Sequence, residues 1–152
     1  MIQIEHAFVG DFLKIAQLDR TAWAQNLNSE YIPDGEHVWR IWIEHALVFC
    51  AKESDGVLGV ALAFPTLEGS FCVHKVFVDK AYRGKGIAGR LFEALFLELD
   101  TMDAGCFLTV DPANENAIRL YEKWGFTNCQ HIPGYYREDE DRLVLERPSK
   151  SK

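Results

Sequence analysis

The order in which strand-like and helix-like patterns of apolar residues follow one another most constrains the fold of this chain. Two β-rich runs, Leu47–Ala51 and Val57–Phe64, are separated by a short polar segment that ends in an Asp-Gly dipeptide typical of tight hairpins. Phe71–Val78 is a further strand pattern, and a helix pattern then separates it from the strand pattern Cys106–Val110. Strands with a short connection are antiparallel, whereas strands joined through a helix run parallel. The sequence therefore predicts an α/β fold with a mixed, mostly antiparallel sheet.

The remaining patterns complete the order of elements. Ile2 and Ile4 alternate with polar neighbours and predict a short first strand, while Thr127–Ile132 and Arg142–Leu145 predict two strands at the end. The helical period occurs in four stretches: Val9–Trp23, Gly35–Ala46 (with Pro33 and Asp34 as start signals), Gly86 to about Met102, and Glu115–Trp124. This order predicts helices on both faces of the sheet.

The length of the chain and its apolar content suit one domain. Its 152 residues are the size of an ordinary domain, and 48% of them are hydrophobic, which supplies one core without metals or disulfides. No repeat and no Pro/Gly/Ser-rich linker divides the sequence. We therefore expect a single domain over residues 1–147 and a flexible tail over residues 148–152.

Composition also limits the partners and the compartment. The formal net charge is −7, whereas binding to nucleic acid needs a broad basic surface, so nucleic acid is not an expected partner. No secretory pattern and no apolar run of spanning length is present, so we expect a cytoplasmic protein without a membrane partner. The four cysteines lack the spacing of metal sites, so we expect reduced thiols and no metal. The oligomeric state is open, and a homodimer is one of its options.

The segment Tyr82–Arg90 lies between a strand pattern and a long helix pattern, and it is rich in glycine. A helix start leaves backbone N–H groups without partners, and Ser, Thr, Asp or Asn usually caps it. No such residue stands directly before this helix. Instead, Gly84 and Gly86 let a ligand approach the backbone, and Arg83 and Lys85 add positive charge. This combination predicts a site for an anion such as a pyrophosphate, with a glycine-rich turn carrying incidental surface cations as the alternative.

Gly84–Gly89 also matches the dinucleotide fingerprint G-x-G-x-x-G, but its context is wrong. In that motif the first glycine closes a turn directly after the strand, whereas residues 79–83 intervene here after Val78. Asp111, which could imitate the ribose-binding acid, lies further from Gly84 than the spacing of about 20 residues in the fingerprint. A dinucleotide-binding enzyme is therefore the weaker interpretation.

Two blocks of residues resemble the GCN5-related N-acetyltransferase (GNAT) family. That family carries Arg/Gln-x-x-Gly-x-Gly/Ala at the start of its central helix, and Arg83, Gly86 and Ala88 fill this pattern. The segment Asn114–Phe126 resembles the family's Asn-x-x-Ala-x-x-x-Tyr-x-x-x-Gly-Phe block. The element order is similar over nearly the whole chain. The resemblance implies a GNAT-like sheet whose central parallel pair splays apart, and transfer of an acetyl group from acetyl-CoA to a primary amine.

The resemblance also implies which residues bind acetyl-CoA and act in the reaction. The backbone amides that would hold the coenzyme A pyrophosphate belong to Arg83, Gly84, Lys85, Gly86, Ile87 and Ala88. Main-chain groups of Phe77 and Val78 would pair with the pantetheine arm, and Asn114 would contact the same arm. Tyr121 would be the general acid that protonates the leaving thiolate. Transfer would be direct, without a covalent acyl-enzyme.

Several groups could serve as the general base. A primary amine with a pKa near 10.4 is mostly protonated at neutral pH and must lose a proton before it attacks. His74, on the strand pattern Phe71–Val78, resembles the place where polyamine-type members of the family carry a glutamate, and histidine suits a base at neutral pH. A structural role for His74 is equally open. Glu68 in the preceding loop and a chain of water molecules are the alternatives.

A second resemblance concerns the C-terminal part and the acceptor. Gly134-Tyr135-Tyr136, followed by an acidic loop, resembles the ribosomal-protein alanine N-acetyltransferases. Those carry a glutamate base where this chain has Thr109, and a hydroxyl cannot replace a carboxylate as base. The acceptor therefore stays open among a small amine, a polyamine and a peptide or protein amine. A non-catalytic acyl-CoA-binding or sensor module of the same fold is the alternative function.

Overall fold

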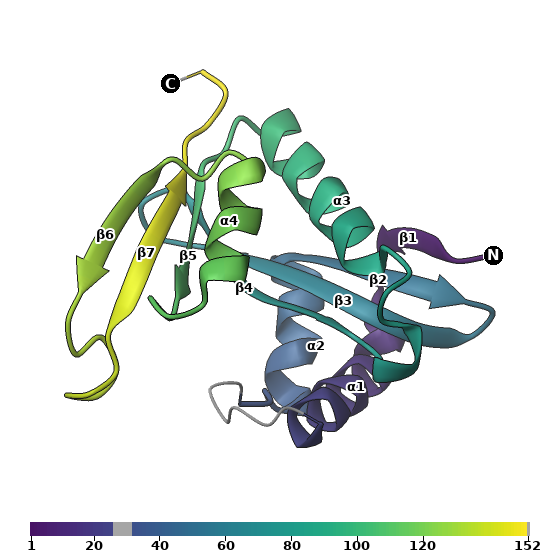
Figure 1. The fold of residues 1–152 in the computed structure, drawn as a ribbon. Coiled ribbons are helices and arrows are strands. Elements are labelled where there is room, and N and C mark those ends of the chain that lie inside the picture. Colours follow the sequence, from purple (N-terminus) through teal and green to yellow (C-terminus); the bar gives the residue numbers. More distant parts are fainter. Residues whose placement is uncertain (26–31, 152) are drawn as a thin grey trace. The chain divides into compact units, whose positions relative to one another are not determined.

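The structure, a computed structural model, describes residues 1–25 and 32–151, and its strands form a seven-stranded sheet in the order β1-β2-β3-β4-β5-β7-β6 (Figure 1). The strands are β1 (Gln3–His6), β2 (Leu47–Glu53), β3 (Gly56–Pro65), β4 (Phe71–Val78), β5 (Cys106–Val110), β6 (Asn128–Ile132) and β7 (Arg142–Arg147). β1 with β2, β2 with β3, β5 with β7 and β6 with β7 are antiparallel. β4 and β5 are parallel, with Phe71 opposite Cys106 and Cys72 opposite Phe107. The predicted mixed, mostly antiparallel sheet is confirmed.

The four predicted helices are present, with small shifts at their ends. They are α1 (Phe12–Ala24), α2 (Glu36–His45), α3 (Ile87–Thr101) and α4 (Glu115–Lys123), with short 3-10 turns η1 (Val9–Asp11) and η2 (Lys80–Tyr82). Gly35 and Ala46, predicted as the ends of the second helix, are its N-cap and C-cap residues with extended backbone. No helix among the described residues combines the length and the apolar character needed to cross a membrane.

The turn between β2 and β3 is displaced from the Asp-Gly dipeptide that predicted it. Glu53 pairs with Gly56, so Ser54 and Asp55 form the turn and Gly56 already belongs to β3. Ser54 has a positive φ of 56°, a conformation that residues with side chains adopt only uncommonly. The hairpin prediction is thus confirmed, but the turn lies one residue earlier than the dipeptide indicates.

The chain forms two compact units. The first comprises Met1–Phe64 and His74–Glu98, and therefore contains β1, β2, α1, α2 and most of α3. The second comprises Pro65–Val73 and Leu99–Lys152, and contains β5, β6, β7 and α4. β4 begins in the second unit and continues in the first.

In the first unit, helices cover both faces of the strands. The core cluster with α1 and α2 contains Ile15, Ala16, Leu18, Ala22, Trp39, Val48, Val60, Leu62 and Phe77. A Cβ added to Gly59 would instead meet Leu91 of α3 at 3.1 Å. Successive strand residues point to opposite faces, so Gly59 faces α3 while Val60 faces α1 and α2. Figure 1 shows α3 on one side of β3 and the helix pair α1 and α2 on the other, as the sequence predicts.

In the second unit, Arg147 joins three elements. Its guanidinium group donates two parallel hydrogen bonds to Asp100 at the end of α3, at 2.9 and 3.1 Å. Its Nε donates to the carbonyl oxygen of Trp124, the C-cap residue of α4, at 2.7 Å. The hydrogen bonds from Arg147 hold the pKa of Asp100 below its usual range. β7 is thereby tied to the ends of α3 and α4.

The last residues make local contacts in the same unit. Ser149 is buried, and the backbone N–H of Ser151 donates to Asp103 at 3.1 Å. These contacts lie in the segment that the sequence assigns to a flexible tail. The single domain over residues 1–147 stays a prediction.

Candidate functional site

The glycine-rich loop before α3 has an open backbone. Gly84 and Gly86 have positive φ values of 80° and 77°, which glycine adopts readily and other residues rarely do. A Cβ added to either would meet no atom within 4 Å, so the backbone conformation, and not crowding, requires glycine there. The first turn of α3 contains no acidic residue, and the first N–H groups of a helix have no acceptor within it. The loop can therefore present backbone N–H groups to an anion.

The two cations of the loop point to different neighbours. Arg83 donates from Nε to the carbonyl oxygen of Val78 at 3.3 Å, at the end of β4. The Nζ atom of Lys85 lies 5.1 Å from the centroid of the Tyr82 ring. Ile87 is buried and anchors the start of α3. The carbonyl of Val78, predicted to pair with a pantetheine arm, is thus engaged by Arg83 in this structure.

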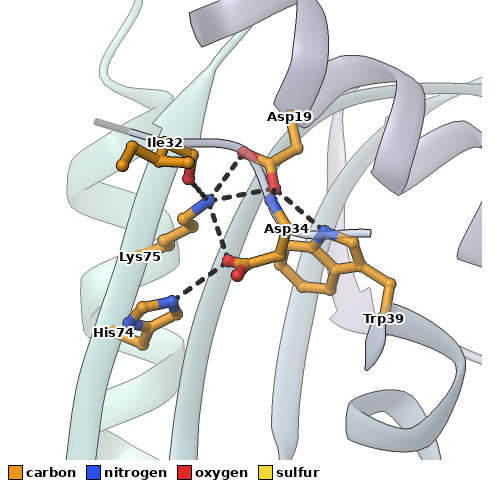
Figure 2. Close-up of polar contacts among 6 residues, drawn as sticks. All are labelled: Asp19, Ile32, Asp34, Trp39, His74 and Lys75. Carbon is orange, nitrogen blue, oxygen red and sulfur yellow. Dashed lines mark hydrogen bonds and ion pairs between the residues drawn. The ribbon is translucent and has the colours of Figure 1, made fainter. Parts of the chain in front are cut away.

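A buried ammonium group and two carboxylates lie close together in the first unit (Figure 2). The Nζ atom of Lys75 lies 3.0 Å from both carboxylate oxygens of Asp19 and 2.8 Å from Oδ2 of Asp34. It also donates to the carbonyl oxygen of Ile32 at 2.6 Å. Asp19 accepts further bonds from Nε1 of Trp39, at 2.9 Å, and from the backbone N–H of Asp34, at 2.8 Å. These contacts compensate charges whose burial would otherwise be costly.

His74 lies at the accessible end of this group. Its Nε2 atom is 3.1 Å from Oδ2 of Asp34, the oxygen that also contacts Lys75. Its ring centroid lies 5.4 Å from that of Trp42 and 5.7 Å from that of Phe64. Both His74 and Lys75 reach the Asp34 carboxylate, although Lys75 is buried and His74 is not. The histidine side chain is 36% exposed and therefore open to solvent.

Asp34 is held in its ionised form. Burial alone would raise the pKa of its carboxyl group, but hydrogen bonds from His74 and Lys75, together with their charges, hold that pKa below its usual range. At neutral pH the carboxylate oxygens of Asp34 can therefore only accept hydrogen bonds.

Tyr121, the predicted general acid, lies half-buried on α4 in the second unit. Its ring meets that of Phe126 edge to face, with centroids 5.6 Å apart. Burial raises the pKa of its hydroxyl group above the ordinary value of 10.0. The hydroxyl therefore keeps its proton throughout the neutral range, which a general acid requires.

Asn114, a predicted cofactor-binding residue, is the N-cap residue of α4. Its Oδ1 atom accepts a hydrogen bond from the backbone N–H of Ala117 at 3.2 Å. Asparagine is among the residues that cap helices best, so this role alone accounts for the residue type. The exposed side chain still carries an amide NH2 group that can donate to a ligand.

Thr109 of β5 contacts Tyr136, the second residue of the C-terminal tyrosine pair. Its hydroxyl lies 3.2 Å from the hydroxyl of Tyr136. The ring of Tyr136 meets Tyr135 edge to face and lies 5.1 Å from the guanidinium carbon of Arg142. Thr109 thus belongs to a polar contact between β5 and the loop after β6.

The acidic loop before β7 partly neutralises itself. Glu140 pairs with Arg137 and lies 3.7 Å from Arg142. Asp141 accepts a hydrogen bond from the backbone N–H of Gly134 at 3.0 Å. These two acids therefore order the loop, which reduces the charge available to attract a cationic acceptor.

The cysteines are expected to be reduced thiols without a role in the reaction, and Glu68 is an alternative general base. Burial raises the pKa of Cys50 and Cys106 to about 12 and that of Cys72 to about 11. These thiols are protonated and poor nucleophiles at neutral pH, in agreement with direct transfer. Glu68 is exposed in the turn between β3 and β4. Within residues 1–25 and 32–151, no three His, Cys, Asp or Glu side chains are grouped to hold a metal ion.

The charged group around Lys75 was not predicted from the sequence. One signal was available. Lys75 is a lone lysine in the apolar run of β4, and Asp19 occurs at the helical spacing of the apolar residues of α1. A buried charge of this kind usually has a partner. Asp34 was interpreted only as a helix start signal, since nothing local links it to residues that are distant in the chain.

Comparison with known proteins identifies a matching family and several relatives named as acetyltransferases. Residues 12–126 match a family model described as the acetyltransferase (GNAT) family. An N-alpha-acetyltransferase of Saccharolobus solfataricus is 36% identical over 86 residues, which cover 55% of this chain and 52% of that protein. An L-2,4-diaminobutyric acid acetyltransferase of Marinococcus halophilus is 40% identical over 77 residues, 48% of this chain and 44% of that protein. The chain thus spans about half the length of these relatives.

A solved structure shares the fold over nearly the whole chain. The ribosomal-protein-S18-alanine N-acetyltransferase from Escherichia coli superposes with a TM-score of 0.80 at 23% sequence identity. The superposition covers 98% of this chain and 94% of that one. At this identity the likeness concerns the fold.

Proposed function

Because the chain belongs to the acetyltransferase (GNAT) family, we propose that it transfers an acetyl group from acetyl-CoA to a primary amine. The observation that carries the proposal is the open loop before α3, where Gly84 and Gly86 adopt positive φ. A helix start with accessible N–H groups and nearby cations suits a pyrophosphate, which coenzyme A contains.

In this proposal the binding of acetyl-CoA uses mostly backbone groups. The amides of Arg83–Ala88 hold the pyrophosphate, and the main chain of Phe77 and Val78 pairs with the pantetheine arm. Arg83 must then give up its hydrogen bond to the Val78 carbonyl, which frees the guanidinium group for a phosphate oxygen. Asn114 contributes its amide NH2 group, because its oxygen caps α4.

The proposed reaction is one direct displacement, with proton transfers through His74 and Tyr121. His74 accepts a proton from the ammonium form of the acceptor, and the neutral amine nitrogen then attacks the thioester carbonyl carbon. The carbon–sulfur bond breaks as the amide forms, Tyr121 gives its proton to the leaving thiolate, and the proton that the acceptor nitrogen loses on becoming an amide restores the Tyr121 hydroxyl. The raised pKa of Tyr121 supports this role, because the hydroxyl is protonated when the thiolate departs. Glu68 and water remain the alternative bases.

Two observations bear on the acceptor class, and one of them favours a small amine. The relatives are named for an alpha-amino group and for a small diamino acid, so a peptide N-terminus and a small amine both stay open. Thr109 cannot act as a carboxylate base, which favours the small amine or polyamine. We keep the cytoplasm as the expected compartment, with no nucleic acid or membrane partner.

An amine panel tests the proposal. Release of coenzyme A thiol from acetyl-CoA would be measured with a small diamine, a polyamine, and peptides that offer only an N-terminal or only a lysine amine. The proposal expects release that depends on the amine and falls in His74→Ala and Tyr121→Phe. Tight coenzyme A binding without release for any amine would instead support the acyl-CoA-binding or sensor module.

A further inference from the structure

The hydrogen bond between His74 and Asp34 has one direction. Asp34 is ionised at neutral pH, so its Oδ2 atom can only accept, and Nε2 of His74 must carry the hydrogen. In a neutral histidine one ring nitrogen carries the hydrogen and the other has a free lone pair. The proton-accepting atom of His74 is therefore Nδ1.

Asp34 cannot easily turn away from His74. Its Oδ2 atom is held by the Lys75 ammonium at 2.8 Å, and its backbone N–H is bound to Asp19. Lys75 is fixed in turn by Asp19 and by the carbonyl of Ile32. Trp42 and Phe64 lie near the His74 ring. Figure 2 shows the polar contacts as one connected set from α1 to β4.

We propose that Asp34 is a positioning residue for His74, which keeps the proton of the neutral ring on Nε2 and leaves Nδ1 to accept the proton of the amine. The proposal rests on the proposed function, in which His74 is the base. It extends that function to a second residue and to one atom of the ring.

A protonated His74 would keep a carboxylate partner. Among the described residues, the group contains the carboxylates of Asp19 and Asp34 and the ammonium of Lys75. After protonation at Nδ1 the imidazolium keeps its bond to the Asp34 carboxylate. The aromatic neighbours of His74, Trp42 and Phe64, are uncharged. Proton transfer from the amine to His74 therefore creates no unpaired buried charge.

The first test needs only the wild-type chain without ligands. Side-chain nitrogen NMR of 15N-labelled protein, at a pH where His74 is neutral, reports which ring nitrogen carries the hydrogen, and His74→Gln assigns the signal. The proposal expects the hydrogen on Nε2 with Nδ1 unprotonated. A neutral His74 that carries its hydrogen on Nδ1 overturns the proposal, whether or not the chain proves to be an acetyltransferase.

The second test is kinetic and uses Asp34→Asn. We expect kcat to fall about tenfold or more, which is a part of the 10²–10⁴-fold that a positioned base contributes, with KM for acetyl-CoA unchanged. The NMR spectrum of the variant should show His74 as a mixture of tautomers. The matched control is Asp55→Asn in the exposed turn between β2 and β3, which should retain wild-type kcat. A folded Asp34→Asn variant with wild-type kcat and an unchanged tautomer contradicts the proposal.

Failure of the proposed function has a different signature. If no amine is acetylated by the wild-type chain, the reaction is wrong, while the NMR result still decides the His74–Asp34 arrangement. If His74→Ala acetylates amines at the wild-type rate, His74 is not the base, and the positioning role falls with it.

Discussion

The Nζ atom of Lys75 lies 3.0 Å from both carboxylate oxygens of Asp19, and Asp19 is fully buried. A buried ion pair is a weak source of stability by itself, because desolvation of both charges offsets their attraction. Loss of one partner is much more costly, since the other charge is left buried without compensation. The pair therefore makes the first unit sensitive to either residue.

Lys75→Met should destabilise the chain by about 3–5 kcal/mol, because Asp19 and Asp34 lose their shared cation. Denaturant unfolding measures this change. The same substitution at exposed Lys80 is the control, with an expected effect within about 0.5 kcal/mol. Equal stability of the two variants would show that the buried group does not hold the first unit together.

The lowered pKa of Asp100 predicts that the stability of the second unit depends on pH. Its pKa is lowered in the folded state by the hydrogen bonds from Arg147, so its contribution is fully present above its unfolded-state pKa of about 3.9. The contribution is lost as the pH falls through the lower folded-state value. Thermal unfolding from neutral pH to about pH 2 should therefore show a smaller acid loss for Asp100→Asn than for the wild type. Parallel curves would contradict this prediction.

Gly86→Ala should weaken coenzyme A binding, because the residue has a φ of 77° and alanine would strain or rearrange the loop. Calorimetric titration of coenzyme A measures the affinity. Gly89→Ala is the matched control, since Gly89 lies inside α3 without a positive φ and a Cβ there meets no atom within 4 Å. Alanine is a better helix former than glycine, so this control should bind normally and unfold at a higher temperature. Equal weakening by both substitutions would mean that the loop conformation is not the cause.

Tyr121→Phe should lower kcat by about 10²–10⁴-fold and leave KM for acetyl-CoA nearly unchanged, because it removes one proton donor. Burial raises the pKa of Tyr121, so loss of rate through its ionisation should begin only above its ordinary pKa of about 10. Tyr135→Phe, in the loop after β6, should keep the wild-type rate. An equal kcat for Tyr121→Phe and the wild type would exclude the acid role.

The order of helices and strands could be predicted from the sequence because it depends on local period. The apolar run of β3 and the 3.6-residue period of α3 each indicate their element without information from elsewhere in the chain. The turn at Ser54 lies one residue before the predicted position. Its place depends on the register of pairing across the hairpin, which a dipeptide signal does not determine. Local chemistry therefore predicts the elements better than their junctions.

The candidate site was predictable only where a motif covers it. The loop at Gly84 and Gly86 is continuous in sequence, so its open backbone could be expected. The contacts among Asp19, Asp34 and Lys75 join residues that are far apart in the chain, and no local sequence pattern predicts them. The prediction for Asn114 was incomplete for a different reason. It did not include the helix cap, and one side chain can both cap a helix and donate to a ligand.

The most direct test of acetyl transfer by this chain is the mass of an amine after incubation with acetyl-CoA and the wild-type protein. We predict that at least one amine of the panel gains a single acetyl group in step with thiol release. The gain should fall sharply with Tyr121→Phe or His74→Ala. No mass change in any amine, while coenzyme A still binds at the loop before α3, would contradict the proposed activity.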